Sequence, residues 1–180
     1  MSLEAVSGVR VHSIRGFEDE RGSLYRLFDD DYFAANDDSF RASYTLLSRN
    51  PSKGTLRGLH YQEAPFGEGK FLSCLTGAIF LAVFDLRPES DSFLASGAMT
   101  FAAADRKAVY VPAGLALGWM TLDEHTDVHY TIDGEFNASA SRGVRFDDPV
   151  LSFAWPSEPR VISEKDLSWP DFAVPAQGNP

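Results

Sequence analysis

The sequence predicts an all-β protein of the jelly-roll type, in which two antiparallel sheets pack face to face. Segments of roughly five to eight residues, rich in β-branched and aromatic side chains, recur along the chain. Turn signals separate several of them, at 87–90, 104–107 and 122–125. Only two segments, one towards each end, have helical features. The expected fold is therefore a double-stranded β-helix with short terminal helices.

The first third of the chain contains alternating segments and one helical segment. Strands are expected at 9–14, 23–28 and 41–48. A turn at 19–22 precedes the second strand, and a loop at 49–54 follows the third. Residues 29–36 begin with three aspartates, and negative charge at this end compensates a helix dipole. We therefore expect one short helix there.

The centre of the chain carries the motif Gly54-Thr-Leu-Arg-Gly-Leu-His60-Tyr-Gln62, followed eight residues later by Lys70. Its glycines allow another chain segment to approach the backbone closely. Residues 70–87 contain the turn pair Thr76-Gly77 between two apolar segments, which predicts a hairpin. Residues 79–84 are continuously apolar, so this strand is expected to be buried on both faces.

The last part of the chain predicts a strand at 142–149 and a rigid turn at 155–159. Ser163 is a credible helix N-cap, which places Asp166 in the first helical turn. There the helix dipole favours the charged carboxylate. Residues 173–180 are expected to form a frayed tail.

Length and composition indicate one globular domain, 1–180, with its core at about 9–170. The chain is 44% hydrophobic, and no apolar stretch approaches the roughly 20 residues that span a bilayer. A net charge of −10 argues against nucleic acid or an anionic membrane as a partner. The one cysteine, Cys74, lies in an apolar strand, so we expect an inert core thiol and a reducing, cytoplasmic location.

The spacing of the central motif and of Val111-Pro-Ala-Gly114-Leu-Ala-Leu117 matches the frame of a cupin, a jelly-roll barrel. In metal-binding cupins this frame supplies several histidines and a glutamate. Here Gln62 and Leu117 stand at two of the histidine positions, which leaves His60 as the one imidazole. A zinc or iron site needs at least three converging ligands, so no metal ion is expected.

A set of motifs, taken together, resembles the dTDP-4-dehydrorhamnose 3,5-epimerases. The matching segments are Asp19-X-Arg21-Gly22, residues 53–62, Glu68-X-Lys70, Asp85-Leu-Arg87-Pro88, Val111-Pro-X-Gly114, Thr121-Leu-Asp123, residues 142–149, Trp155-Pro156 and residues 163–166. The resemblance implies a metal-free and cofactor-free homodimer, in which an N-terminal strand crosses to the partner sheet. It also implies a nucleotide-linked 4-keto-6-deoxy sugar as substrate, and a place in dTDP-rhamnose and polysaccharide biosynthesis.

By this resemblance the general base falls on His60, its carboxylate partner on Asp166 and the enolate-stabilising residue on Lys70. Substrate contacts fall on Arg21, Ser48, Asn50, Arg57, Gln62, Asp147 and Lys165. The chemistry requires such residue types independently. A proton beside a ketone leaves only to a positioned base, and the resulting enolate oxygen needs a cation or donor. Arginine provides the forked donors that a diphosphate accepts.

The sequence also departs from the family at several positions, and three of them concern the site. Phe136 aligns with the tyrosine expected to donate a proton on the opposite sugar face, and a phenyl ring has no proton to give. Leu117 replaces a histidine near the ketone, and Arg26 replaces a glutamate that contacts the nucleoside. Water, Glu135 or Tyr130 then remain as proton donors, and we expect efficient inversion at no more than one centre.

Two classes of function follow from these observations. The leading hypothesis is a nucleotide-sugar epimerase that uses His60 as base. The alternative is a non-catalytic or diverged nucleotide-sugar-binding cupin, and a general carbohydrate-binding cupin is a third hypothesis. Asp166 favours an enzyme, because a pure binder needs no carboxylate behind its histidine. Phe136 and Leu117 favour the binder.

Overall fold

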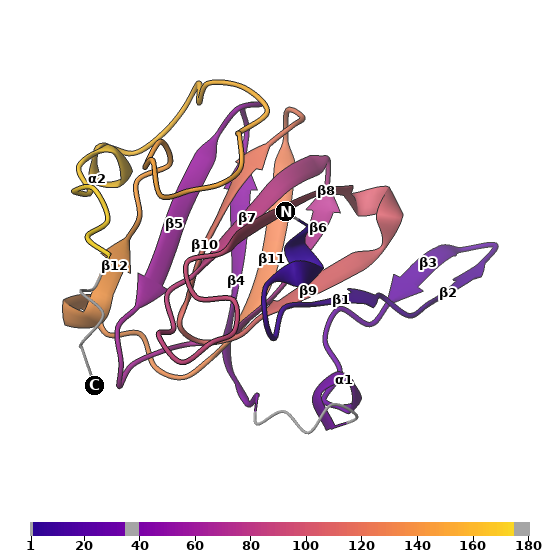
Figure 1. Cartoon of the computed structure of the whole chain (residues 1–180). Helices are drawn as coiled ribbons and strands as arrows, with labels where there is room; N and C mark the ends of the chain where they lie inside the picture. Colours follow the sequence, from indigo (N-terminus) through magenta and orange to yellow (C-terminus); the bar gives the residue numbers. More distant parts are fainter. Residues whose placement is uncertain (1, 35–39, 175–180) are drawn as a thin grey trace.

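The computed structural model describes residues 2–34 and 40–174 (Figure 1). Two five-stranded antiparallel sheets form the body. The first sheet has the order β1 (Arg10–Ser13), β9 (Lys107–Val111), β6 (Lys70–Thr76), β11 (Thr126–Asp133) and β4 (Ala42–Asn50). The second has the order β12 (Ser141–Gly143), β5 (Leu56–Gln62), β10 (Leu115–Thr121), β7 (Ala78–Asp85) and β8 (Ser96–Ala102). The predicted jelly roll is confirmed.

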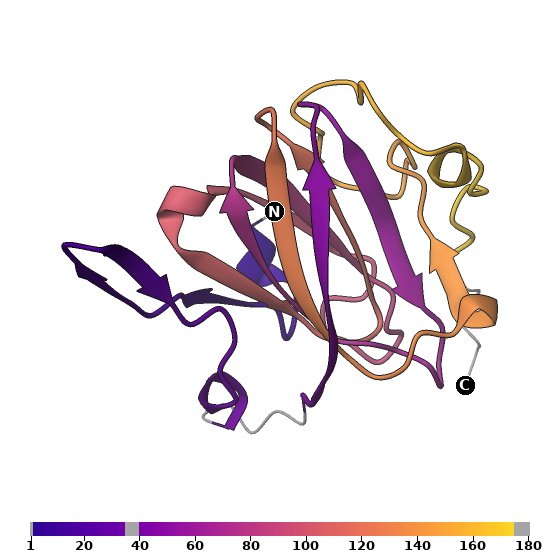
Figure 2. The same cartoon turned by 180° about the vertical axis from the view of Figure 1, so that it is seen from behind.

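Short elements complete the chain. The strands β2 (Gly16–Asp19) and β3 (Gly22–Tyr25) form a separate hairpin, which projects away from the body in both views (Figures 1 and 2). The α-helices are α1 (Asp31–Ala34) and α2 (Glu164–Leu167), and three-residue 3-10 helices are η1 (Leu3–Ala5), η2 (Ala103–Asp105) and η3 (Ala138–Ala140). Residues 35 and 36, at the end of the predicted first helix, lie outside the described residues.

The core lies between the two sheets and takes apolar side chains from both. Leu72 and Val109 of the first sheet and Leu81 and Leu117 of the second belong to one buried cluster. The prediction that residues 79–84 are buried is largely confirmed, because five of these six residues are buried and Phe80 is half-buried. The two sheets therefore share one apolar interior.

The predicted hairpin at 70–87 is wrong. β6 pairs with β9 and β11, whereas β7 pairs with β8 and β10, so the Thr76-Gly77 turn carries the chain from one sheet to the other. Gly77 adopts φ of 72°, which suits such a turn. Two apolar strands joined by a turn look alike in sequence whether they pair with each other or face each other. The strand predicted at 142–149 is also shorter, because pairing ends at Gly143.

One glycine of the central motif sets how closely two strands of the second sheet approach each other. Gly58 adopts φ of 106°, and a Cβ added there would lie 2.6 Å from the carbonyl oxygen of Leu117. β5 and β10 therefore approach each other more closely than any other residue type at position 58 would allow. This contact sets His60 opposite Leu117 in the strand register.

Candidate active site

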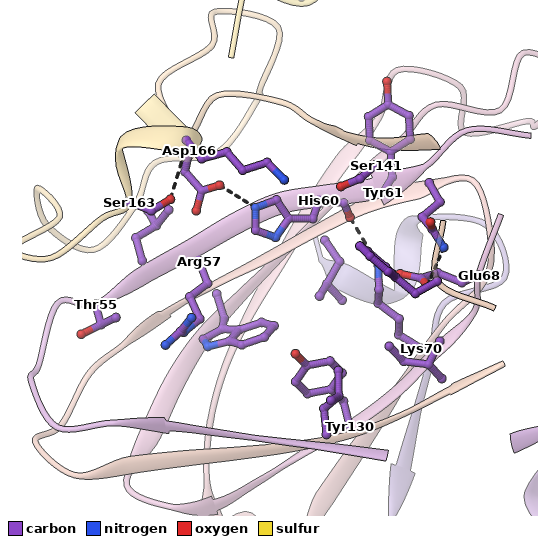
Figure 3. A pocket seen from close by; sticks show the side chains of 18 of the residues that line it. Thr55, Arg57, His60, Tyr61, Glu68, Lys70, Tyr130, Ser141, Ser163 and Asp166 are labelled. Atoms are coloured by element: carbon purple, nitrogen blue, oxygen red, sulfur yellow. Dashed lines mark hydrogen bonds and ion pairs between the residues drawn. The ribbon is translucent and has the colours of Figure 1, made fainter. Parts of the chain in front are cut away.

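A cavity of about 550 Å³ opens between the two sheets, a size that suits a small organic ligand. β5 and β10 supply one wall, β4, β6 and β11 supply the other, and the segment around α2 closes one side. Predicted residues among its lining are His60, Asp166, Lys70, Arg57, Gln62, Lys165, Leu117 and Phe136. Figure 3 shows His60 and Asp166 facing Lys70 and Tyr130 across this space.

His60 and Asp166 form a dyad. His60 Nε2 lies 2.6 Å from Asp166 Oδ1, and the histidine side chain is 42% exposed while the aspartate is 6% exposed. The backbone N–H of Gly58 donates to Asp166 Oδ2 at 3.4 Å. With Nε2–H donating to the carboxylate, Nδ1 keeps its lone pair. The dyad is therefore a histidine base held in one tautomer by a carboxylate.

The predicted cap of α2 is confirmed, and it places this carboxylate. Ser163 Oγ accepts a hydrogen bond from the backbone N–H of Asp166 at 3.1 Å. Burial raises the pKa of Asp166, but its bonds to His60, Gly58 and Ser163 outweigh burial and hold the pKa below the usual value. The cap at Ser163 thus places an ionised Asp166 carboxylate next to the His60 ring.

Lys70 begins β6 and lies across the cavity from the dyad. Its side chain is 9% exposed, and Nζ is 3.1 Å from Glu68 Oε1 and 3.4 Å from the carbonyl oxygen of His60. Glu68 is equally buried and also accepts from Gln62 Nε2 at 2.8 Å. An ammonium buried beside the base can stabilise a developing oxyanion.

Tyr130 on β11 places a phenol in the same cavity. Its ring packs against Trp119 at a centroid distance of 5.6 Å, in an edge-to-face arrangement. Burial raises the pKa of Tyr130; Arg57 opposes this effect and Glu68 adds to it. The hydroxyl therefore stays protonated at neutral pH. It is a candidate proton donor, one of the alternatives that the sequence left open.

Arg57, Asn50 and Ser48 form a single unit. Arg57 lines the cavity, and its Nε donates to Asn50 Oδ1 at 2.8 Å. Asn50 is 1% exposed, and its Nδ2 donates to the carbonyl oxygens of Ser48 and Thr126. Ser48 and Asn50 do not belong to the cavity lining. They hold Arg57, whose terminal guanidinium nitrogens have no partner within the described residues.

Four further predicted residues line the cavity. Lys165 on α2 brings a second cation, with Nζ 5.5 Å from the centre of the Trp169 ring. Gln62 is buried, and its amide already bonds Glu68, the carbonyl oxygen of Glu135 and the backbone N–H of Asn137. Leu117 adds only apolar surface. Phe136 is 65% exposed, so it lies at the open side.

Besides Ser48 and Asn50, three further predicted residues do not line the cavity of their own chain. Arg21 lies on the projecting hairpin, where it is 85% exposed and pairs with Asp19 at 2.5 Å. Arg26 pairs with Asp29 at 2.6 Å in the loop after β3. Asp147 pairs with Arg145 beside a second, smaller hollow. The structure thus separates these side chains from His60.

Several side chains that line the cavity have no role predicted from the sequence. Tyr44, Glu68 and Trp119 belong to its wall. Alternation alone places Trp119 on the same face of β10 as Leu117, so strand periodicity could have found it. Glu68 lies in a loop, and no periodic signal assigns its direction.

Other predictions concern metal and cysteine. In the described ranges 2–34 and 40–174, no three His, Cys, Asp or Glu side chains gather closely enough to hold a metal ion. Metal independence nevertheless stays a prediction.

Cys74 is buried as expected, and burial raises the pKa of its thiol to about 11. No helix of the same ranges is long and apolar enough to cross a membrane.

Comparisons with known proteins identify the family of this chain. Residues 4–174 match the sequence model of the dTDP-4-dehydrorhamnose 3,5-epimerase family. A relative with that name from Sinorhizobium fredii is 33% identical over 173 residues, which covers 93% of this chain and 87% of the relative. The crystal structure of dTDP-4-dehydrorhamnose 3,5-epimerase from Bacillus anthracis, with TDP and PPi bound, superposes with a TM-score of 0.87 at 29% identity, covering 92% of this chain and 95% of that one.

A second similar structure is that of ChmJ, a 3'-monoepimerase from Streptomyces bikiniensis, in complex with dTDP-quinovose. It is 26% identical with a TM-score of 0.85, covering 94% of this chain and 86% of that one. A double variant of ChmJ with the substitutions H60N and Y130F was solved with dTDP. Since the family match spans nearly the whole chain, this chain belongs to the dTDP-4-dehydrorhamnose 3,5-epimerase family, a family of isomerases.

Proposed function

We propose that this chain is a nucleotide-sugar epimerase that acts on a dTDP-4-keto-6-deoxy-hexose, with His60 as the base. The observation that carries the proposal is the His60–Asp166 dyad, 2.6 Å apart, in the same cavity as Lys70 and Tyr130. Family membership favours this hypothesis over a non-catalytic binder. The names of the relatives, and the TDP and dTDP-sugar ligands in similar structures, support the substrate class.

The proposed reaction removes a proton and returns one on the other face. His60 Nδ1 takes the proton from a carbon next to the ketone, and the C–H electron pair moves into an enolate. Lys70 Nζ donates a hydrogen bond to the enolate oxygen. A phenol then delivers its proton to the same carbon, which leaves a phenolate. Solvent afterwards removes the proton from the histidine and reprotonates the phenolate.

We assign the proton donor to Tyr130. Its hydroxyl belongs to a cavity-lining residue, and burial keeps it protonated. The ChmJ variant replaces a histidine and a tyrosine that are 70 positions apart, and His60 and Tyr130 have the same spacing here (130 − 60 = 70). The Phe136 ring then only lines the open side of the cavity. With Tyr130 as the donor, the missing hydroxyl at Phe136 no longer predicts inefficient inversion of the substrate carbon.

Arg57 and Lys165 are the proposed anion end of the site, which binds the diphosphate. Arg57 is held by Asn50 and keeps its terminal nitrogens available. In this proposal Asn50 and Ser48 do not touch the substrate but hold the Arg57 side chain in place. Gln62 likewise holds the loop at 135–137, whose backbone it bonds. Asp147 remains a proposed substrate contact whose side chain lies outside the cavity.

We also propose a homodimer. The hairpin that carries Arg21 exposes Phe17 (78%) and Leu24 (73%), which face each other across its two strands. Exposed apolar pairs on a projecting hairpin suit a protein partner, and a second copy would bring Arg21 to a neighbouring cavity. A cytoplasmic location is the accompanying proposal, supported by the buried thiol of Cys74.

Exchange in heavy water tests the function. Wild-type protein should transfer deuterium to a carbon next to the ketone of a dTDP-4-keto-6-deoxy-hexose, whereas His60→Ala should lose this exchange by at least the factor of about 100 to 10,000 that a positioned base contributes. A wild-type protein that binds the sugar nucleotide without exchange would instead be a binder.

A further inference from the structure

Glu68 is a charged side chain in the catalytic end of the cavity to which neither the sequence nor the proposed reaction gives a task. Its side chain is 9% exposed and belongs to the cavity lining. A carboxylate is rarely buried unless it is paired and hydrogen-bonded. Both of its oxygens are in fact used, each on a different part of the site.

The first oxygen acts on Lys70. Glu68 Oε1 lies 3.1 Å from Lys70 Nζ, and the carbonyl oxygen of His60 lies 3.4 Å from the same nitrogen. An ammonium has three N–H donors. Two are directed to these acceptors, which leaves one for a ligand. A flexible lysine thereby gains a fixed direction in the same cavity as the base.

The second carboxylate oxygen of Glu68 is linked by hydrogen bonds to the segment at the open side of the cavity. Glu68 Oε2 accepts from Gln62 Nε2 at 2.8 Å and from the Tyr44 hydroxyl at 3.5 Å. Gln62 in turn bonds the backbone on either side of Phe136, because its Nε2 donates to the Glu135 carbonyl oxygen and its Oε1 accepts from Asn137 N–H at 2.7 Å. One carboxylate therefore links the ammonium to the segment that carries the exposed phenyl ring.

We propose that Glu68 is a positioning residue, which aims the Lys70 ammonium at the substrate ketone and, through Gln62, holds the Phe136 segment at the entrance. This inference rests on the proposed function, because it assumes that Lys70 faces an enolate. Glu68 does not touch the reacting atoms. Its contribution reaches the reaction through Lys70, as a charged partner that fixes the side chain before the substrate arrives.

The matching control residue is Glu63, at the start of the same loop. Glu63 is 48% exposed and pairs with Arg142 at 2.8 Å, outside the cavity lining. Glu68→Gln and Glu63→Gln each remove one carboxylate charge and one ion pair. They differ in whether Lys70 loses its partner.

The experiment measures deuterium exchange and KM for the dTDP-4-keto sugar in five proteins: wild type, Glu68→Gln, Lys70→Met, the double variant of Glu68 and Lys70, and the control Glu63→Gln. Glu68→Gln should lower kcat by about 100-fold, the cost of a misplacement of about 1 Å, with little change in KM. It should cost nothing further in the Lys70→Met background, and Glu63→Gln should match wild type. Equal losses in both backgrounds, or a wild-type rate in Glu68→Gln, would overturn the inference.

A second measurement does not depend on activity. Acetylation of lysines, mapped by mass spectrometry, should modify Lys70 several-fold faster in Glu68→Gln than in wild type, with Lys53 unchanged as internal reference. Unchanged labelling of Lys70 would also overturn the inference. If Glu68→Gln does not fold, Glu68→Asp keeps the charge but shortens the reach, and should show the same faster labelling. A wild type that exchanges no deuterium would refute the proposed function, while the labelling result still decides the position of Lys70.

Discussion

The two ends of the cavity differ in how completely one chain builds them. At the catalytic end, Asp166, Lys70 and Glu68 are each at least nine-tenths buried, and each is bound to a protein partner. At the anion end, Arg57 keeps terminal nitrogens without partners in the described residues, and Arg21 is 85% exposed on a distant hairpin. The groups proposed to carry out the chemistry are thus fixed before a ligand binds, whereas the groups proposed to bind the nucleotide lack such fixed partners.

This difference has a physical reason. Proton transfer requires donor and acceptor to be held within hydrogen-bond reach, so the catalytic groups need rigid partners. A diphosphate carries strong charge and accepts several forked donors, so its binding tolerates side chains that settle on contact. Substitutions at the two ends should therefore separate binding from turnover.

The largest binding effect is expected at Arg57. Arg57→Ala should weaken dTDP binding by about 1.5 to 3 kcal/mol, as for a hydrogen bond to a charged group. Calorimetry with dTDP measures this change. Arg49→Ala is the control, because Arg49 is 77% exposed and pairs weakly with Asp127, at 3.9 Å. Equal affinities of the Arg57 and Arg49 variants would place the diphosphate elsewhere.

Arg21 should have a smaller effect that depends on assembly. If the hairpin reaches a partner's cavity, Arg21→Ala should weaken dTDP binding about tenfold, near 1.4 kcal/mol, without changing the sedimentation of the dimer. Phe17→Ser combined with Leu24→Ser should reduce dimerisation as well. A wild-type protein that sediments as a monomer at micromolar concentration would contradict this part of the account.

The smallest effect concerns pH and stability. Burial raises the pKa of Asp166, but His60, Gly58 and Ser163 lower it to a net value below 3.8. A folded pKa below the unfolded one stabilises the protein above the unfolded value, and this contribution is lost as the pH falls through the folded value. Asp166→Asn should therefore cost about 1 kcal/mol of unfolding free energy at pH 7.

The cost of Asp166→Asn should shrink as the pH drops below about 4. Urea unfolding at several pH values measures it, with Asp147→Asn as the control, since that side chain is 53% exposed. A cost that stays constant down to pH 2 would mean that the carboxylate is not held ionised by its partners.

Sequence patterns predicted the parts of the molecule that depend on local chemistry. Ser163 and Asp166 follow from capping rules, and residues 79–84 from an apolar run. The motif around His60 and Lys70 indicated the cavity. Each of these features is specified by a short stretch of chain.

Other features depend on how distant segments meet. Nothing in residues 70–87 distinguishes two strands that pair from two strands that belong to opposite sheets. The role of Asn50 as the anchor of Arg57 depends on the approach of β4 to β5. The residues around Arg21 also give no pattern that assigns this side chain to the cavity of its own chain or to that of a second copy. The sequence leaves Tyr130 as one of three alternative donors, beside water and Glu135, because its place in the cavity depends on how β11 packs against the other sheet.

The central claim is that His60 removes a proton and Tyr130 returns one from the opposite face. Its most direct test follows exchange and inversion together, by NMR of a dTDP-4-keto-6-deoxy-hexose in heavy water, for wild type, Tyr130→Phe and Phe136→Tyr. The account predicts that Tyr130→Phe keeps deuterium exchange but loses inversion by about 100-fold or more, the contribution of a positioned acid. Phe136→Tyr should leave the ratio of inversion to exchange unchanged. Normal inversion in Tyr130→Phe, or a large gain of inversion in Phe136→Tyr, would contradict the account.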